Sequence, residues 1–442
     1  MYLFLLYLFL LSLAFPIYHI YKALKHSHSN VIPEDMQSKS FSLIVPCYNE
    51  ANVVDSIVHN LSNVTHLQTE VILINDGSTD DTLSLLIDRL QLVPEEYTFQ
   101  GPMETEEVRG VYRSTHLPFV KVIDKENGGK ADSINTGINA SVNDYVITLD
   151  ADSFLKSDAL DYITLSLQDP DVVAVGGNVQ VVQSLDAKGK SVFSPMNMLL
   201  KLQTLEYLKG FYILKESLAK SQALSIISGA FGVFDRKILL EVGGFRRTIG
   251  EDMDITMKIQ HHIIGKGKKV VFQPQAVCYT EIPSTYKDFF KQRIRWQKAF
   301  VDCLFIYLPK FMKNPTKTNL SFFFFFDSFN VGLLATFSTF LFLVYCLFNP
   351  TPEMLLFLLL FFTISSAVNL VYNIAALKVA GRFDNNFSKT ERFSLAIAFL
   401  LDFIFYRFLN IFIIVIGSLL YFVNKEAWNK VDRQKTVYNF IP

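Results

Sequence analysis

Two aspartates separated by one residue follow a short apolar run and form the most chemically suggestive pair in the chain. Asp150 and Asp152 come directly after Tyr145 to Leu149. In an extended segment alternate side chains share a face, so we expect both carboxylates to emerge together. Such a pair repels itself unless a cation neutralises it, and carboxylate oxygens suit Mg²⁺ or Mn²⁺. An Asp-x-Asp pair also arises by chance, so the pair alone does not decide whether a metal binds here.

Polar loops also follow two earlier apolar runs. The first contains Pro46, Tyr48 and Glu50, and the second contains Asp76 before Gly77. Both patterns are typical of loops that open onto helices and bind ligands. Both are equally typical of tight turns and helix N-caps, and the residues alone leave the choice open.

Lys130 follows a pair of glycines within Asp124 to Asp132. The glycines allow a ligand to approach the backbone, and the lysine offers a point charge to a phosphate. The spacing is not that of a phosphate-binding P-loop, because GxxxxGK is missing. A glycine turn with a solvated lysine is the alternative.

Two later segments carry further candidate groups. Glu251 and Asp252 precede apolar residues at helical spacing, a place where acidic residues are ordinary because the helix dipole favours them. A basic, aromatic stretch from Tyr286 to Phe300 also fits a helix on a membrane surface. Its candidate residues are Gln292, Arg295 and Trp296.

Short strands must position these loops. Five mostly apolar runs separated by helix-sized segments predict an α/β fold with a buried, mostly parallel sheet. They are Ser42 to Pro46, Val71 to Asn75, Phe119 to Ile123, Tyr145 to Leu149 and Val172 to Val175. Sheets of this kind bind ligands at the carboxyl ends of their strands, where the candidate residues lie.

Long apolar blocks flank this region. Met1 to Ala23 has no charge before Lys22 and is long enough to cross a bilayer, so we expect a retained helix and no cleaved signal. Three later blocks are also long enough: Phe322 to Phe348, Met354 to Leu377 and Phe393 to Val423. The last of them contains Asp402 and Arg407, and we expect it to be interfacial or re-entrant.

Basic residues after the first helix and in the loop with Lys378 and Arg382 place the soluble region in the cytosol. We therefore expect a multi-pass protein of the inner or plasma membrane. The chain has 41 basic and 42 acidic residues, which leaves no basic footprint for nucleic acid. Its four cysteines show no CxxC spacing, which argues against a zinc site or a disulfide framework.

The predicted organisation has six parts. They are a transmembrane helix at 1–23, a linker at 24–40, a soluble domain at 41–285, interfacial helices at 286–317, a transmembrane region at 318–424 and a tail at 425–442.

The motifs in order read PCYNE, NDGSTDDT, ENGGKAD, DADS, SGAFG, GED and QRIRW. Their order and separation, over roughly Phe41 to Phe300, resemble the inverting family 2 glycosyltransferases. This group has the GT-A fold, and it includes cellulose, hyaluronan and poly-N-acetylglucosamine synthases. The flanking apolar helices resemble the processive branch. The motif that contains Asp252 begins with Gly250 where many processive members have threonine, but the carboxylate is kept.

The resemblance implies roles for the candidate residues. Asp76 would hold the uracil and ribose of the donor beside Pro46, Tyr48 and Glu50, and Lys130 would face the diphosphate. Asp152 would bind the metal, with Asp150 nearer the donor sugar. Asp252 would be the general base, with Glu251 beside it. The acceptor and diphosphate residues would be Gly229, Gln292, Arg295 and Trp296.

We therefore expect a Mg²⁺- or Mn²⁺-dependent enzyme that transfers N-acetylglucosamine from a UDP-sugar to a growing β-linked polysaccharide and couples this to export. Membrane lipids and accessory export subunits are the other expected partners. One alternative is a non-processive enzyme that glycosylates diacylglycerol or polyprenyl phosphate. Another is a catalytically silent scaffold, which would require the loss of an essential carboxylate. Asp76, Asp150, Asp152 and Asp252 are all present.

Overall fold

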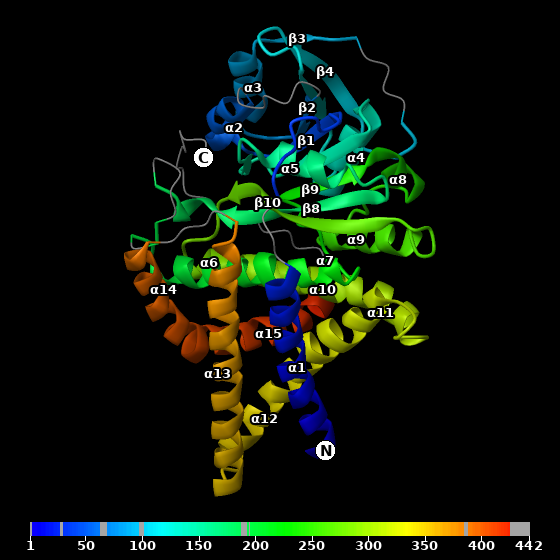
Figure 1. The fold of residues 1–442 in the computed structure, drawn as a ribbon. Coiled ribbons are helices and arrows are strands. Elements are labelled where there is room, and N and C mark those ends of the chain that lie inside the picture. Colours follow the sequence, from blue (N-terminus) through cyan, green and yellow to red (C-terminus); the bar gives the residue numbers. More distant parts are fainter. Residues whose placement is uncertain are drawn as a thin grey trace. The chain divides into compact units, whose positions relative to one another are not determined.

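The computed structural model of the chain describes residues 2–26, 30–61, 69–96, 101–186, 192–193, 195–383 and 388–424. The chain forms two compact units (Figure 1). The sheet unit comprises the described residues within 30–190 and 226–281, and the helical unit comprises those within 2–26, 192–225 and 282–424. The predicted domain boundaries at 41 and 285 stay a prediction. The structure adds that residues 195–225, which lie between these boundaries, belong to the helical unit. The predicted tail lies outside the described residues.

One mixed sheet organises the sheet unit. Its order is β3-β4-β5-β2-β1-β6-β9-β8-β10-β7. The strands are β1 (Phe41–Cys47), β2 (Thr69–Asp76), β3 (Leu92–Pro94), β4 (Val108–Ser114), β5 (Val120–Lys125), β6 (Tyr145–Leu149), β7 (Phe154–Leu155), β8 (Val172–Val181), β9 (Phe231–Asp235) and β10 (Lys269–Thr280).

All five predicted strands are present, as β1, β2, β5, β6 and β8. The run β5-β2-β1-β6 is parallel, and β8 is parallel to β10. The predicted α/β fold with a parallel sheet is confirmed for these pairs, and the sheet is mixed outside them, because β9 runs antiparallel to both β6 and β8, and β4 runs antiparallel to β5. The half-exposed β4, with the sequence VRGVYRS, lacks the apolar run by which buried strands are recognised.

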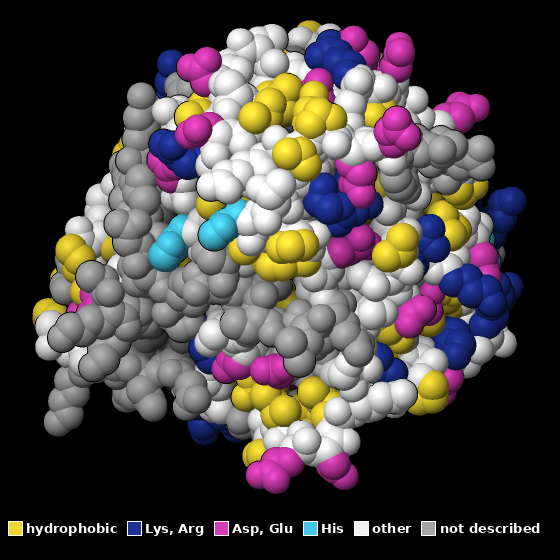
Figure 2. All heavy atoms as spheres, turned by 90° about the horizontal axis from the view of Figure 1, so that it is seen from above, with side chains coloured by type: hydrophobic (Ala, Val, Ile, Leu, Met, Phe, Trp, Pro, Cys, Tyr) yellow, Lys and Arg dark blue, Asp and Glu magenta, His cyan; other side chains and the backbone are white. Residues whose placement is uncertain are grey.

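Helices pack around the sheet. They are α2 (Val54–Leu61), α3 (Thr82–Leu90), α4 (Lys130–Ala140), α5 (Ala159–Ser166), α8 (Arg236–Glu241) and α9 (Glu251–His262). Helix α4 packs on β1 and β2, where a Cβ added at Gly137 would lie 2.5 Å from Ile44 Cγ2. This close contact fixes the helix whose first residue is Lys130. On the face shown in Figure 2, basic and acidic side chains are interspersed.

Three helices of the helical unit, within the part of the chain that the structure describes, are long and apolar enough to cross a membrane. They are Leu3–Lys25, Asn319–Phe348 and Pro352–Ala380. The elements concerned are α1 (Tyr2–His26), α11 (Asn319–Phe323), the π-helix η4 (Phe324–Ala335), α12 (Thr336–Phe348) and α13 (Pro352–Ala380). The apolar blocks predicted at 322–348 and 354–377 fall within these spans, and the block predicted at 1–23 overlaps the first span from residue 3.

The fourth predicted apolar block does not form one long helix. It is divided into α14 (Lys389–Leu401), the π-helix η5 (Asp402–Tyr406) and α15 (Arg407–Val423). Helix α15 has 17 residues, fewer than the about 20 that a bilayer requires. It lies against α10 (Tyr286–Met312), where Gln297 Nε2 donates to Ser418 Oγ at 3.0 Å. Helices α6 (Met198–Lys209), α10 and α15 run across the direction of α1, α12 and α13 (Figure 1).

A buried carboxyl group lies in α7 (Glu216–Lys220), which follows the π-helix η3 (Gly210–Lys215). Glu216 Oε2 has no hydrogen-bond partner among the described residues, and Lys220 Nζ is 3.8 Å from Oε1. Burial raises the pKa of Glu216 to about 7, and Lys220 offsets only part of this rise. The folded state therefore binds the proton more tightly than the unfolded state.

We expect Glu216→Gln to stabilise the protein at pH 8 and to change its stability little at pH 4.5. The pKa of Glu216 is about 4.3 in the unfolded state and higher in the folded state. Its contribution to the free energy of unfolding is therefore fully present only below about pH 4.3, and it is lost as the pH rises through about 7. The gain at pH 8 should be about 4 kcal/mol, from about 1.4 kcal/mol per pKa unit. Denaturant titrations in detergent at both pH values measure it. Glu126→Gln, at an exposed ion pair with Arg109, is the control and should have little effect at either pH. A gain that is equal at both pH values would contradict the assignment.

Candidate functional site

The loops singled out in the sequence meet at one edge of the sheet. In register, Cys47 of β1 faces Asn75 of β2, and Asp76 of β2 faces Lys125 of β5. Strand β6 is parallel to β1 and ends beside it at Leu149, just before Asp150. The carboxyl ends of four adjacent parallel strands therefore present the candidate residues together, as expected for ligand sites of α/β sheets.

The loops after β1 and β2 are tied to each other. Asn49, in the left-handed region with φ 54°, donates its backbone N–H to Ser78 Oγ at 3.0 Å and accepts from the Thr79 N–H at 2.8 Å. The Glu50 N–H donates to Thr82 Oγ1 at 2.7 Å. This places the segment from Pro46 to Glu50, with Tyr48 half-buried, beside the Asp76 loop. The tight turn expected after Asp76 is therefore present, and a role of these loops in ligand binding stays a prediction.

Asp76 is buried, with 3% exposure, and both of its carboxylate oxygens are occupied. Lys125 Nζ lies 3.0 Å from Oδ1, which also accepts from the Gly128 N–H at 3.0 Å. Oδ2 accepts from the Gly129 N–H at 2.9 Å. In this structure the carboxylate holds the glycine turn, and the predicted contact with uracil and ribose stays a prediction.

Lys125 is the counter-ion of two carboxylates. Its side chain is fully buried, and Nζ lies 2.6 Å from Asp132 Oδ1 as well as 3.0 Å from Asp76. Asp132 also pairs with Arg247. A buried charge is tolerated only when it is paired and hydrogen-bonded, a condition that this cluster meets.

The glycine turn delivers Lys130 into an acidic group. Gly129 adopts φ 85°, a conformation that side-chain-bearing residues rarely tolerate, and α4 begins at the next residue. Lys130 Nζ lies 2.5 Å from Asp150 Oδ1 and 3.3 Å from Glu251 Oε1. Burial alone would lower the pKa of Lys130, but the neighbouring carboxylates outweigh it and raise this pKa above its ordinary value.

Glu251 and Asp252 form the first turn of α9, where the helix dipole favours acidic residues. Asp252 Oδ2 accepts from the Gly229 N–H at 3.1 Å, and Oδ1 accepts from the Met253 N–H at 2.8 Å. Burial raises the pKa of Glu251, while Lys130 opposes the rise and Asp252 adds to it. Gly229 is close to this group, because an added Cβ would lie 2.9 Å from Lys130 Nζ.

Asp150 and Asp152 do not lie in an extended segment. Strand β6 ends at Leu149, and the Ser153 N–H donates to the Asp150 carbonyl at 3.0 Å, so residues 150–153 form a turn. The prediction of strand alternation across this pair is therefore wrong. Both carboxylates still lie close enough to Cys278 that, after burial, their charges help to raise the pKa of its thiol.

The side chains at this edge fit only part of a metal site. The described residues hold no group of three or more His, Cys, Asp or Glu side chains arranged to bind a metal. Mg²⁺, however, is commonly bound by one or two carboxylates together with substrate phosphates. Asp150 and Asp152 fit that pattern, and the phosphates would have to come from the substrate.

The remaining predicted residues lie on α10 of the helical unit. Trp296 is 40% exposed, and the Arg293 guanidinium lies over its ring, 4.1 Å from the centroid. Arg293 also pairs with Glu206 at 2.8 Å. Gln292 Oε1 is buried without a hydrogen-bond partner among the described residues, and Arg295 is half-buried. Arg293 thus orders Trp296 from within the motif that contains it.

Sequence reasoning missed Lys125, Asp132 and Arg293, which contact the candidate site residues or their partners. A signal for Lys125 was available, since a lysine that ends an apolar strand next to a strand ending in aspartate suggests a buried pair. No comparable signal marked Arg293. Its partner Glu206 lies 87 positions away along the chain.

Glycosyltransferase families and polysaccharide synthases match this chain in sequence. A family model described as Glycosyl transferase family group 2 matches residues 145–372, and one described as Glycosyl transferase family 2 matches residues 42–96. Poly-beta-1,6-N-acetyl-D-glucosamine synthase of Staphylococcus aureus (strain MSSA476) is 29% identical over 264 residues, which are 59% of this chain and 54% of that protein. The synthase of the same name from Staphylococcus epidermidis is 29% identical over 269 residues, 60% of this chain and 56% of that protein. The chain thus spans about half the length of the curated relatives it matches.

Among solved structures, the mannosyltransferase PcManGT from Pyrobaculum calidifontis, in complex with GDP-Man and Mn²⁺, aligns with a TM-score of 0.50. The alignment covers 95% of this chain and 100% of that chain at 17% sequence identity. The likeness is one of fold.

We expect Lys125→Met to destabilise the protein by about 3–5 kcal/mol, because it leaves Asp76 buried beside Asp132 without their shared counter-ion. Lys269→Met is the matched control, since it breaks an exposed ion pair with Asp169. Exposed pairs contribute little, so this variant should unfold like the unaltered protein. The free energy of unfolding in detergent measures both. Equal values for the two variants would show that the buried cluster is not a stabilising centre.

Proposed function

Because the chain belongs to glycosyl transferase family group 2 and its sheet unit has a GT-A type fold, we propose that this glycosyltransferase extends a β-linked polysaccharide from a UDP-sugar donor, with inversion at the anomeric carbon. N-acetylglucosamine is the proposed sugar. Support comes from the 29% identity to the staphylococcal synthases and from the segment Ser228 to Gly232, which resembles the acceptor loop of that branch.

The observation that carries the proposal is the arrangement of Asp252. Two backbone amides, from Gly229 and Met253, orient its carboxylate, and each oxygen keeps a lone pair for another donor. In the proposed step an acceptor hydroxyl oxygen bonds to the sugar C1 while its proton passes to Asp252. The C1–O bond to the diphosphate breaks, and UDP leaves with the electron pair.

Lys130, together with a metal ion held by the neighbouring aspartates, would supply the positive charge that the donor diphosphate needs. With Nζ 2.5 Å from Asp150, Lys130 is placed to share its charge between that carboxylate and a bound diphosphate. Asp150 and Asp152 are the residues proposed to hold Mg²⁺ or Mn²⁺, which would neutralise the leaving diphosphate when bound. The proposed donor pocket also includes Pro46, Tyr48 and Glu50.

The helical unit has its own proposed roles. Gln292, Arg295 and Trp296 would help close the site, with the exposed part of the Trp296 ring stacking on an acceptor sugar. The three long apolar helices support a location in the inner or plasma membrane. Basic residues next to the spans, such as Lys22 and Arg382, support a cytosolic sheet unit. We extend the proposal to coupled export, with accessory subunits as possible partners.

We expect Asp252→Asn to lower sugar transfer by about 100- to 10,000-fold, the contribution of a positioned general base. The amide keeps the size of the side chain but cannot accept the proton. Incorporation of radiolabelled UDP-N-acetylglucosamine by membranes supplied with Mg²⁺ or Mn²⁺ measures the effect. Asp88→Asn, at an exposed position of α3, is the control and should keep full activity. Full activity of Asp252→Asn would refute the assigned base.

The product distinguishes the proposal from its alternative. With radiolabelled UDP-N-acetylglucosamine, we expect a polymer of many sugars, identified by size-exclusion chromatography and linkage analysis. Parallel reactions with UDP-glucose and UDP-galactose are the specificity controls. A single sugar attached to a chloroform-soluble lipid would establish the lipid-modifying alternative. Incorporation from one of the other donors alone would refute the choice of sugar.

A further inference from the structure

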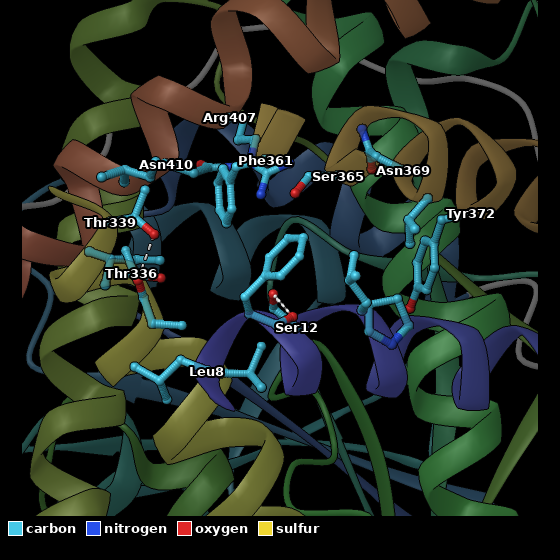
Figure 3. A pocket seen from close by; sticks show the side chains of 18 of the residues that line it. Leu8, Ser12, Thr336, Thr339, Phe361, Ser365, Asn369, Tyr372, Arg407 and Asn410 are labelled. Atoms are coloured by element: carbon cyan, nitrogen blue, oxygen red, sulfur yellow. Dashed lines mark hydrogen bonds between the residues drawn. The ribbon is translucent and has the colours of Figure 1, made fainter. Parts of the chain in front are cut away.

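The helical unit contains an open cavity of about 610 Å³ that the proposed transfer does not use. Ligand pockets are typically about 300–1,000 Å³, so it could hold a ligand of moderate size. On α13 the lining positions include Phe357, Phe361, Ser365, Asn369 and Tyr372, which recur at helical spacing and lie on one face. Faces of α1 and of η4–α12 lie opposite, and Figure 3 shows the side chains around the space.

All three π-helical segments in the described part of the chain contribute to the cavity wall. Gly210 belongs to η3, Asp327 to η4 and Asp402 to η5, and each lines the cavity. π-Helical turns are rare and are frequently found at functional sites. Their convergence on one space indicates a built site.

The cavity lining combines charged and apolar side chains. His19 and Asp327 both line it, and His19 Nε2 lies 3.0 Å from Asp327 Oδ2. Leu5, Phe342 and Phe357 line it as well, and the two phenylalanine rings are 5.4 Å apart. A ligand that contacts both kinds of side chain must itself have a polar and an apolar part.

Two other charged groups of the lining, Lys209 and Asp402, form an ion pair with each other. Asp402 Oδ2 lies 2.8 Å from Lys209 Nζ and accepts from Asn369 Nδ2 at 2.8 Å. It also accepts from Asn373 Nδ2 at 3.1 Å. One carboxylate oxygen therefore receives three donors, and neither Lys209 nor Asp402 needs a ligand for its charge.

Arg407 differs, because within the described ranges no carboxylate pairs with its guanidinium. It lies over the Phe361 ring, 5.6 Å from the centroid. Three other lining groups, the Asn410 amide, the Ser365 hydroxyl and the Tyr372 hydroxyl, likewise have no hydrogen-bond partner among the side chains that the structure describes. An unpaired cation among apolar helices is costly and marks a functional site. The missing partner has to be anionic and able to accept hydrogen bonds.

We propose that this cavity binds one anionic membrane phospholipid, with its phosphate at Arg407 and Asn410 and an acyl chain between the apolar faces of α1, α12 and α13. An acyl chain suits Leu5, Phe342 and Phe357, whereas a sugar polymer would leave hydroxyl groups unpaired there. The lipid is a bound ligand of the helical unit and takes no part in the proposed transfer.

Binding to the full chain in detergent tests the proposal. The probes are phosphatidylglycerol, phosphatidylcholine with the same acyl chains, and glycerol 3-phosphate as the head group alone, each titrated and followed by native mass spectrometry. We expect one phosphatidylglycerol per chain, bound at least ten-fold more tightly than phosphatidylcholine, and no binding of glycerol 3-phosphate. Equal retention of the two lipids, or tight binding of glycerol 3-phosphate, would overturn the proposal.

Variants locate the site. Arg407→Gln should lower phosphatidylglycerol affinity at least ten-fold, and Arg407→Lys should keep most of it. Arg382→Gln is the matched control, because that guanidinium donates to the Leu24 carbonyl at 2.7 Å and does not line the cavity. Ala335→Phe, which narrows the cavity without changing charge, should also weaken binding at least ten-fold. Thermal unfolding without added lipid identifies folded variants.

Unchanged affinity in folded Arg407→Gln or Ala335→Phe would overturn the assigned location. Because no nucleotide sugar is present, this result is independent of the proposed transfer. A failed lipid site would leave the transfer assay unaffected, and an inactive Asp252→Asn variant should bind the lipid normally.

Discussion

The ammonium group of Lys125 sits between the carboxylates of Asp76 and Asp132, and no part of its side chain reaches solvent. Two carboxylates this close and this deeply buried cannot both stay charged without a cation between them. The ion pair keeps the Asp76 carboxylate charged, and this carboxylate accepts hydrogen bonds from the N–H groups of Gly128 and Gly129. The turn before α4 is thus held by a charge from the neighbouring strand.

Everything on the acidic side of the site follows from that turn. Because α4 begins at Lys130, the turn determines where the Lys130 ammonium meets Asp150 and Glu251. The two lysines are five residues apart but have different properties. The Lys125 side chain is fully buried, whereas that of Lys130 is one-third exposed, so in the proposed function Lys130 is the one that would contact a substrate phosphate. Lys125 thus fixes the turn that positions the site, and Lys130 lies within the site.

Much of the strand framework could be predicted from the sequence, because buried parallel strands leave continuous apolar runs and their last residues fall at one edge. The position of Asp252 at a helix start followed from helical spacing in the same way. The antiparallel strands were not predicted. Strand β4 is half-exposed and leaves little pattern, whereas β9 is a buried apolar run as long as β6 that was not singled out. The Lys125 cluster depends on strand register, and Arg293 pairs with a residue of another helix. Such contacts are properties of the folded chain, which periodicity does not encode.

The pairing of charges among the apolar helices shows the same limit. Asp402 and Arg407 lie five positions apart in the sequence, and the two could have neutralised each other. Instead η5 turns the Asp402 carboxylate toward Lys209, which is 193 positions earlier in the chain, and toward two asparagines of α13. One oxygen of that carboxylate already receives three donors, and among the described residues no carboxylate forms an ion pair with Arg407. This is why a partner for the guanidinium is sought outside the chain.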